Sequence, residues 1–185
     1  IRDTNYLSGS YILYSKRCKM IGNNITGHSN QGAYIMGSAD ILLEMNEIGG
    51  MEKDGLRIHT SENIISKGNN ISDCDNYAIN IIAPRGINYF YSNRLVGCTI
   101  TSQSDYGYIV MPKNNTLDGR PIYFYKYQDM TGMAVPDDAG MVMGLQTTGL
   151  DISDLELPGY DGIIRMMECD NIRVNNVTLT EGRSP

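Results

Sequence analysis

The sequence contains no tryptophan, two phenylalanines and two histidines, and only 19% of its residues are charged. Its formal net charge is −6, whereas a nucleic-acid-binding protein needs a basic patch or stripe. No apolar run reaches the roughly 18 residues of a membrane-spanning helix. The sequence therefore argues against a nucleic-acid partner and against insertion into a membrane.

Two further signals are missing: a signal peptide and the paired spacings of metal ligands. The chain starts at Ile1 without a methionine, which is typical of a processed chain or of part of a longer one. The four cysteines have no CxxC spacing and the two histidines no HxxxH spacing. Spacing alone therefore supports neither a metal site nor a disulfide.

What the chain does contain is a pattern that returns every 23 residues between Gly9 and Leu95. Phe90 and Leu95 join it after a one-residue slip. The aligned columns are Gly9, Gly32, Gly55 and Ala78; Ile12, Ile35, Ile58 and Ile81; Cys18, Ile41, Ile64 and Ile87; Met20, Leu43, Ser66 and Phe90; Ile25, Ile48, Ile71 and Leu95. A fixed period of this length indicates a stacked repeat protein.

The length and composition of the repeat select the kind of stack. Two packed helices need more than about 30 residues, and a leucine-rich repeat needs a run of leucines that is missing here. We therefore predict an all-β parallel β-helix with three short strands in each rung. The isoleucine columns line its interior, and the asparagines before them adopt left-handed turns and hydrogen-bond from rung to rung.

The repeat also predicts how the chain is divided. We expect one domain over residues 1–185, with a lead-in at 1–8, rungs at 9–111, a projecting hairpin arm at 112–139, further rungs at 140–180 and a tail at 181–185. Rung four is long, because its next inward isoleucine is Ile109, and the extra residues of 99–106 form a loop. Asp118-Gly119 is a hairpin signal, followed by a strand-like run at 122–127.

The coils resume after the arm with a shift of 22 residues. The matching positions are Val142, Leu150, Ile152, Leu155 and Leu157 with Ile164, Ile172, Val174, Val177 and Leu179. Rungs of 22–23 residues therefore occur on both sides of the arm.

One stretch resembles a known family. The asparagine-rich rungs are followed by Asn115-Thr116-Leu117-Asp118-Gly119-Arg120-Pro121-Ile122-Tyr123-Phe124-Tyr125 and by Val135-Pro136-Asp137-Asp138-Ala139-Gly140. This combination is similar to the NosD-like group of right-handed parallel β-helix proteins, part of the carbohydrate-binding and sugar-hydrolase β-helix superfamily. The resemblance implies a right-handed coil and an extracellular, cell-surface or periplasmic setting, as in archaeal and bacterial surface proteins. It implies much less about activity, because fold does not fix function.

The outward columns beside Ile12, Ile35, Ile58, Ile81 and Ile109 are the place to look for chemistry. They hold Tyr11, Tyr34, Arg57, Asn80 and Tyr108 on one side, and Leu13, Met36, His59, Ile82 and Val110 on the other. None is a carboxylate, whereas glycoside hydrolysis needs two. We predict no catalytic residues and a ligand-binding face formed by Tyr11, Tyr34, Arg57, His59 and Tyr108.

The sequence also offers residues for a soft-metal site, a calcium site and glycosylation sites. His28, Met51, Cys74 and Cys98 share one column and are soft-metal ligands, although small or sulfur-containing residues also fill tight turns. Acidic residues at turns, Asp54, Asp73, Asp75, Asp105, Asp137 and Asp138, have the oxygen ligands of a calcium site, but ordinary solvated turns explain them better. Sequons at Asn24, Asn70, Asn114 and Asn176 are candidates for glycosylation. Bound cofactors are not expected.

The leading functional hypothesis is a non-enzymatic β-helix scaffold or adhesion module of the cell surface, binding carbohydrate or assembling with itself. One alternative is a polysaccharide lyase or epimerase, and another is a copper-handling accessory protein. The outward apolar columns would be covered by the arm, by a second copy or by a glycan. Unpaired strand edges at both ends predict a homo-oligomer or a continuation into further coils.

Overall fold

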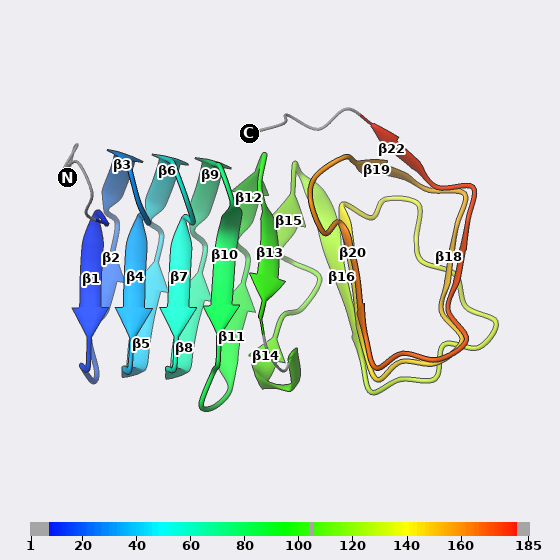
Figure 1. Ribbon diagram of the computed structural model, residues 1–185, viewed down its shortest axis with the longest axis horizontal. Helices are drawn as coiled ribbons and strands as arrows, with labels where there is room; N and C mark the ends of the chain where they lie inside the picture. Colours follow the sequence, from blue (N-terminus) through cyan, green and yellow to red (C-terminus); the bar gives the residue numbers. More distant parts are fainter. Residues whose placement is uncertain (1–7, 104–105, 181–185) are drawn as a thin grey trace.

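The computed structural model describes residues 8–103 and 106–180. It is built from short strands that wind into two adjoining stacks of coils (Figure 1). A short 3-10 helix spans Tyr106–Tyr108. No helix in the described ranges is long and apolar enough to cross a membrane.

Three parallel walls form the first stack. Its first sheet contains β1 (Ser10–Leu13), β4 (Ala33–Met36), β7 (Leu56–His59), β10 (Tyr77–Ile82) and β13 (Thr99–Ser102). The second contains β2 (Lys19–Ile21), β5 (Ala39–Glu44), β8 (Glu62–Lys67), β11 (Asn88–Tyr91) and β14 (Ile109–Val110). The third begins with β3 (Asn24–His28), β6 (Glu47–Met51), β9 (Asn70–Cys74), β12 (Arg94–Val96) and β15 (Thr116–Leu117).

The repeat seen in the sequence is the register of these walls. Ile25, Ile48, Ile71, Leu95 and Leu117 are successive strand partners, each at most 1% exposed. In the first sheet, the inward isoleucines at 35, 58 and 81 are fully buried. The glycine column is explained by crowding at a corner, because a Cβ on residue 55 would lie 2.4 Å from the Cγ2 atom at position 71. The predicted three-strand rung with an isoleucine interior is confirmed.

A ladder of asparagines holds one corner of every rung. The side-chain Nδ2 of each member donates to the Oδ1 of the next, at 2.9–3.0 Å. Its members are Asn23, Asn46, Asn69, Asn93 and Asn115. The predicted rung-to-rung bonding is therefore confirmed. Within this ladder the predicted left-handed asparagine is wrong, because the preceding residue takes that conformation, as at Met45 with φ 53° and Ser92 with φ 53°. Elsewhere the prediction is confirmed, because Asn63, Asn171 and Asn176 adopt it with φ of 52°, 54° and 49°.

The register of the later rungs differs from the prediction at two places. Rung five starts at β13, where Ile100 pairs with Ile79, so residues 99–102 are a wall strand and not part of a loop. Ile109 pairs with Asn88 in the second sheet and does not follow Ile81. Asn88 also accepts a hydrogen bond from the backbone N of Ile64. The one-residue slip therefore lies before Asn88, and it leaves the side chain at position 87 exposed.

The predicted hairpin is present, but it does not project as an arm. β15 pairs antiparallel with β16 (Arg120–Lys126) across Asp118 and Gly119. β16 then pairs along its length with β17 (Met141–Leu145), which pairs with β20 (Ile164–Met167). Residues 120–140 therefore form the first coil of a second stack.

The second stack repeats with the shift expected from the sequence. β18 (Asp151–Ser153) pairs with β21 (Arg173–Asn175), and β19 (Glu156–Pro158) pairs with β22 (Thr178–Thr180). Ile152 and Leu157 are fully buried, whereas their partners in the last described coil are exposed, Val174 by 56% and Leu179 by 57%. The last described coil therefore has its apolar residues exposed.

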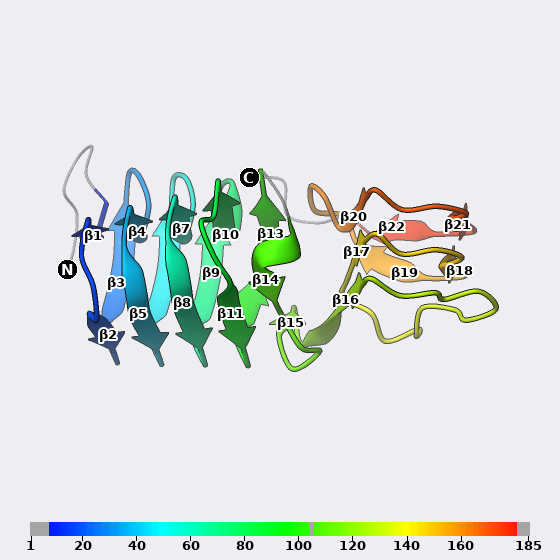
Figure 2. The same cartoon turned by 90° about the horizontal axis from the view of Figure 1, so that it is seen from below.

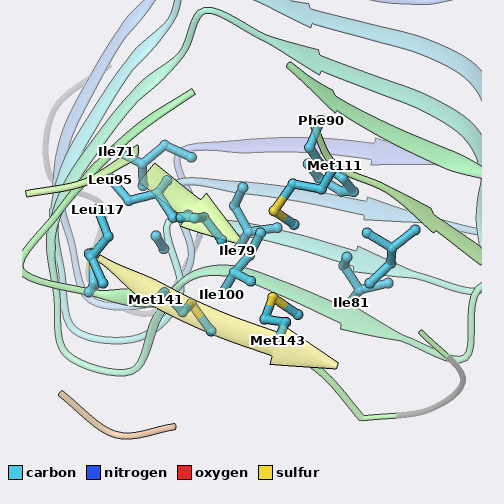
Figure 3. Close-up of a cluster of buried hydrophobic side chains, with 14 of the residues drawn as sticks. Ile71, Ile79, Ile81, Phe90, Leu95, Ile100, Met111, Leu117, Met141 and Met143 are labelled. Carbon is cyan, nitrogen blue, oxygen red and sulfur yellow. The ribbon is translucent and has the colours of Figure 1, made fainter. Parts of the chain in front are cut away.

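The two stacks wind around different axes and share one eight-stranded sheet. In Figure 1 the coils of the first stack are seen edge-on and those of the second stack face-on. In Figure 2 the coils of the second stack are seen edge-on. Met141 and Met143 of β17 point toward Leu117 and Ile100 at the end of the first core (Figure 3). All five residues of β17 are buried, because the first stack covers one face and the second stack's interior covers the other.

An arginine fixes the first coil of the second stack in place. The Arg120 guanidinium donates to the backbone oxygens of Asp137 at 2.8 Å and Glu156 at 2.6 Å. Across the junction, Tyr77 Oη donates to Asp161 Oδ2 at 3.1 Å and Thr99 Oγ1 to the Asp161 backbone oxygen at 2.8 Å. The stacks therefore contact each other through hydrogen bonds as well as through the shared core. Asp105, most of the expected lead-in and the whole expected tail lie outside the described residues.

Candidate ligand-binding face

Tyr11, Tyr34 and Arg57 stand in one row on the outer face of the first sheet. They are direct strand partners in β1, β4 and β7. Their inward neighbours are isoleucines, and the alternation of a strand turns the row outward. The row continues with Asn80 and Thr101, which are buried. The exposed part of the row therefore covers three rungs.

Side chains in this row contact one another. The rings of Tyr11 and Tyr34 lie 6.0 Å apart, edge to face. The Arg57 guanidinium lies 5.7 Å from the centre of the Tyr34 ring. Tyr34 Oη is also 3.2 Å from Nδ1 of His59, which stands in the neighbouring row. The structure thus brings together four of the five residues predicted for ligand binding.

Tyr108 is the exception. It precedes β14, whose residues pair with β11 in the second sheet, so it does not continue the row of Tyr34 and Arg57. Its place in that row rested on aligning Ile109 with Ile81, and that alignment is wrong. The residue that follows Asn80 in the row is Thr101.

A buried carboxylate lies beneath the row. Asp54 is 1% exposed, and its Oδ2 accepts a hydrogen bond from Asn80 Nδ2 at 3.0 Å and lies 3.9 Å from Arg57 Nη1. Burial raises the pKa of Asp54, although the bond from Asn80 and the charge of Arg57 act in the opposite direction. A hydrogen bond from the Tyr77 backbone also acts to lower this pKa. Sequence reasoning placed this residue at a solvated turn.

Replacing Asp54 by asparagine should change how stability depends on pH. The folded-state pKa lies above the unfolded value of about 3.9, so the native protein holds this proton more tightly. The stabilising contribution is present below the unfolded pKa and is lost as the pH rises through the folded pKa. Asp54→Asn should therefore unfold at a higher temperature than the wild type at neutral pH, and the gain should vanish in acid.

Thermal unfolding followed by circular dichroism across this pH range measures the effect. Asp75→Asn is the matched control, because Asp75 is an exposed acid of the neighbouring turn. An Asp54→Asn variant that loses stability at neutral pH would contradict the expectation.

The residues proposed as soft-metal ligands do share one column, but they are spread along it and do not converge on one point. His28 pairs with Met51 and Met51 with Cys74, one residue per rung. Neighbouring strands are about 4.8 Å apart, whereas metal ligands converge within about 2.3 Å of one ion. Among the described residues, no group of three or more His, Cys, Asp or Glu side chains is placed to hold a metal. Of the acidic pair considered for calcium, Asp138 accepts a hydrogen bond from Tyr123 Oη through Oδ1 at 2.8 Å.

Three sequons, at Asn24, Asn70 and Asn114, lie on strands of the third wall or at its corners, and the fourth, at Asn176, follows β21 in the second stack. Asn24 and Asn114 are exposed, and Asn176 is exposed with its Nδ2 bonded to Asp154 Oδ1 at 2.7 Å. Asn70 is half-buried and accepts a bond from Arg94 Nη1 at 3.1 Å. Their use as glycan acceptors stays a prediction.

A hollow of about 330 Å³ lies where the second wall meets β16. Its lining is mostly apolar and includes Tyr91, Val110, Met111 and Phe124. The lysine of this lining, Lys126, donates from Nζ to the Gly107 backbone oxygen at 2.5 Å. The hollow therefore presents packing groups and contains no acid–base pair.

Stacked parallel coils with three walls and an isoleucine interior define the class of β-solenoid proteins. The family model for the right-handed β-helix region matches residues 1–122, which is most of the chain. The chain therefore belongs to the right-handed β-helix family. No curated protein matches it significantly.

Proposed function

We propose that this protein is a non-enzymatic carbohydrate-binding module, in which a glycan lies along the outer face of the first sheet. The observation that carries the proposal is the contiguous row of Tyr11, Tyr34 and Arg57, with His59 bonded to the middle tyrosine. The row follows the stack axis, so an extended chain of sugars can contact several rungs at once.

The chemistry of the row suits a sugar. Tyrosine rings offer apolar faces for the C–H surface of a pyranose, and their hydroxyls both donate and accept hydrogen bonds. The Arg57 guanidinium offers a fork of N–H donors, and its side chain is 32% exposed. Ligand-binding sites combine apolar and aromatic side chains with a few precisely placed polar groups.

Binding without turnover is favoured over hydrolysis by the position of the carboxylate. Glycoside hydrolysis uses two carboxyl groups that flank the scissile bond. The carboxylate beside this row, Asp54, is 1% exposed and bonded to Asn80. A polysaccharide lyase or epimerase is the second candidate, because Arg57 and His59 could neutralise a uronate and exchange a proton.

Membership of the NosD-like group within the β-helix family is also part of the proposal. The stretch at 115–125 with that at 135–140 resembles the NosD-like group, which suggests an extracellular or cell-surface setting. A copper-handling role like that of the group's namesake would need a converging set of ligands. The ladder spacing of His28, Met51 and Cys74 disfavours it.

Binding to a panel of neutral and uronate-containing polysaccharides, followed by calorimetry on the best one, tests the proposal. Tyr34→Ala and Arg57→Ala should each weaken binding by about tenfold or more, equivalent to roughly 1.4 kcal/mol. Tyr89→Ala is the matched control, because Tyr89 points outward from β11 on the second wall.

Two results would overturn the proposal. One is an equal loss of affinity in the Tyr34 and Tyr89 variants, which would show that the glycan does not bind specifically to the outer face of the first sheet. The other is turnover of a uronate polymer that disappears in His59→Ala, which would establish the lyase or epimerase alternative.

A further inference from the structure

Cys74 and Cys98 occupy the same position in adjacent rungs. Ser72 and Val96 are strand partners, and each cysteine follows two residues later in its chain segment. Cys74 Sγ lies 3.3 Å from the Ser72 backbone oxygen, and Cys98 Sγ lies 3.4 Å from that of Val96. The two side chains therefore point in the same direction from neighbouring strands.

The two thiols are also buried inside the wall. The residues are 4% and 2% exposed, and each Sγ donates to the backbone oxygen two residues earlier in its own segment. Register partners in neighbouring parallel strands lie about 4.8 Å apart. That separation is inside the Cα–Cα range of about 4.4–6.8 Å that a disulfide spans.

We propose that Cys74 and Cys98 form a disulfide that joins the third and fourth rungs. The other cysteines lack such a neighbour, since Cys18 lies in the first rung beside the Ile41 position and Cys169 follows β20 in the second stack. The bridge would close a loop of roughly 25 residues, and closing a loop of this size restricts the unfolded chain. The inference does not depend on carbohydrate binding.

The oxidation balances with a small disulfide such as oxidised glutathione as the acceptor of two electrons. The Cys98 thiolate attacks one glutathione sulfur and displaces the other as a thiolate. The Cys74 thiolate then attacks the Cys98 side of the mixed disulfide and releases the second glutathione. The pair loses two protons and two electrons, and one disulfide becomes two thiols.

The electrostatics of the pair support this order of events. Hydrogen bonding from the Cys74 thiol lowers the pKa of Cys98, because it stabilises the thiolate, while burial acts against it. The same hydrogen bond, together with burial, raises the pKa of Cys74. The directions of the two pKa shifts are consistent with attack by Cys98 first and resolution by Cys74.

Refolding the protein in a buffer of oxidised and reduced glutathione tests the inference. The chain has four cysteines; titration should find that two thiols are lost, and peptide mapping should join Cys74 to Cys98. The midpoint of thermal unfolding should rise by roughly 5–10 °C over the reduced protein. Cys18→Ser with Cys169→Ser, which removes the two remaining cysteines, should keep both effects.

Cys98→Ala should lose the bridge and the stabilisation by oxidation, and its circular dichroism shows whether it still folds. Mapping of the wild type decides the question even if this variant does not fold. Four free thiols after oxidative refolding would overturn the inference. So would a mapped bridge that lowers the unfolding midpoint, because it would show that the native register does not accommodate the bond.

Discussion

Ile58→Asp should prevent folding of the first stack. Ile58 is fully buried in β7, with Ile35 and Ile81 at the same position of the rungs on either side. A carboxylate there has no partner, and an uncompensated buried charge costs several kcal/mol. Folded proteins are stable by only about 5–15 kcal/mol, so most of that margin is lost. The measurement is circular dichroism with chemical denaturation of the purified variant.

The control for this variant is Ile65→Asp on β8. Ile65 has the same side chain in the same kind of strand, but it points outward and is 38% exposed. A charge there stays in water, so the expected change in unfolding free energy is within about 0.5 kcal/mol. Equal stability of the two variants would refute the assignment of the isoleucine columns to the interior.

Asn69→Ala should lower the free energy of unfolding by about 3–5 kcal/mol. The Asn69 Nδ2 donates to the Leu43 backbone oxygen and to Asn93 Oδ1, and its Oδ1 accepts from the backbone N of Asn46. All these groups are buried within the ladder, so truncation leaves several of them unpaired. The loss is measured as the change in urea midpoint at constant slope.

Asn23→Ala is the matched control for the ladder. Asn23 forms the same bond to Asn46 Oδ1, but it stands at the exposed first rung, where water can replace the lost partner. Its removal should cost less than about 1 kcal/mol. If both variants lost the same stability, the effect would come from turn propensity and not from buried hydrogen bonds.

The fold of the first stack was largely predictable, because a coil that contacts only its neighbours repeats its requirements in every rung. Isoleucine at positions 25, 48 and 71 indicated both the period and the interior. The prediction failed where the repeat changed length, at Asn88 and Ile100. An extra residue before Asn88 and a shortened rung before Ile100 break the columns in sequence, while hydrogen bonding between strands restores the register in space.

The sequence predicted the row of outward side chains in the candidate site, but not the buried residue beneath that row. Alternation within strands placed Tyr11, Tyr34 and Arg57 together, because side chains two residues apart share a face. The carboxylate Asp54 was missed, since a corner residue has no alternation to show which way it points. Its approach to Arg57 and Asn80 depends on how the chain turns between β6 and β7.

The sequence by itself determined the elements that depend on local and nearest-rung interactions: the strand period, the buried isoleucines, the asparagine ladder and the turn at Asp118 and Gly119. Tertiary structure alone decided the path of the chain after that turn. β16 reverses against β15 and then pairs with β17, so the aromatic segment becomes a wall of a second stack with its own axis. The physical reason is that the open end of the first core needs an apolar cover, which the methionines of β17 provide from more than 20 residues further along the chain.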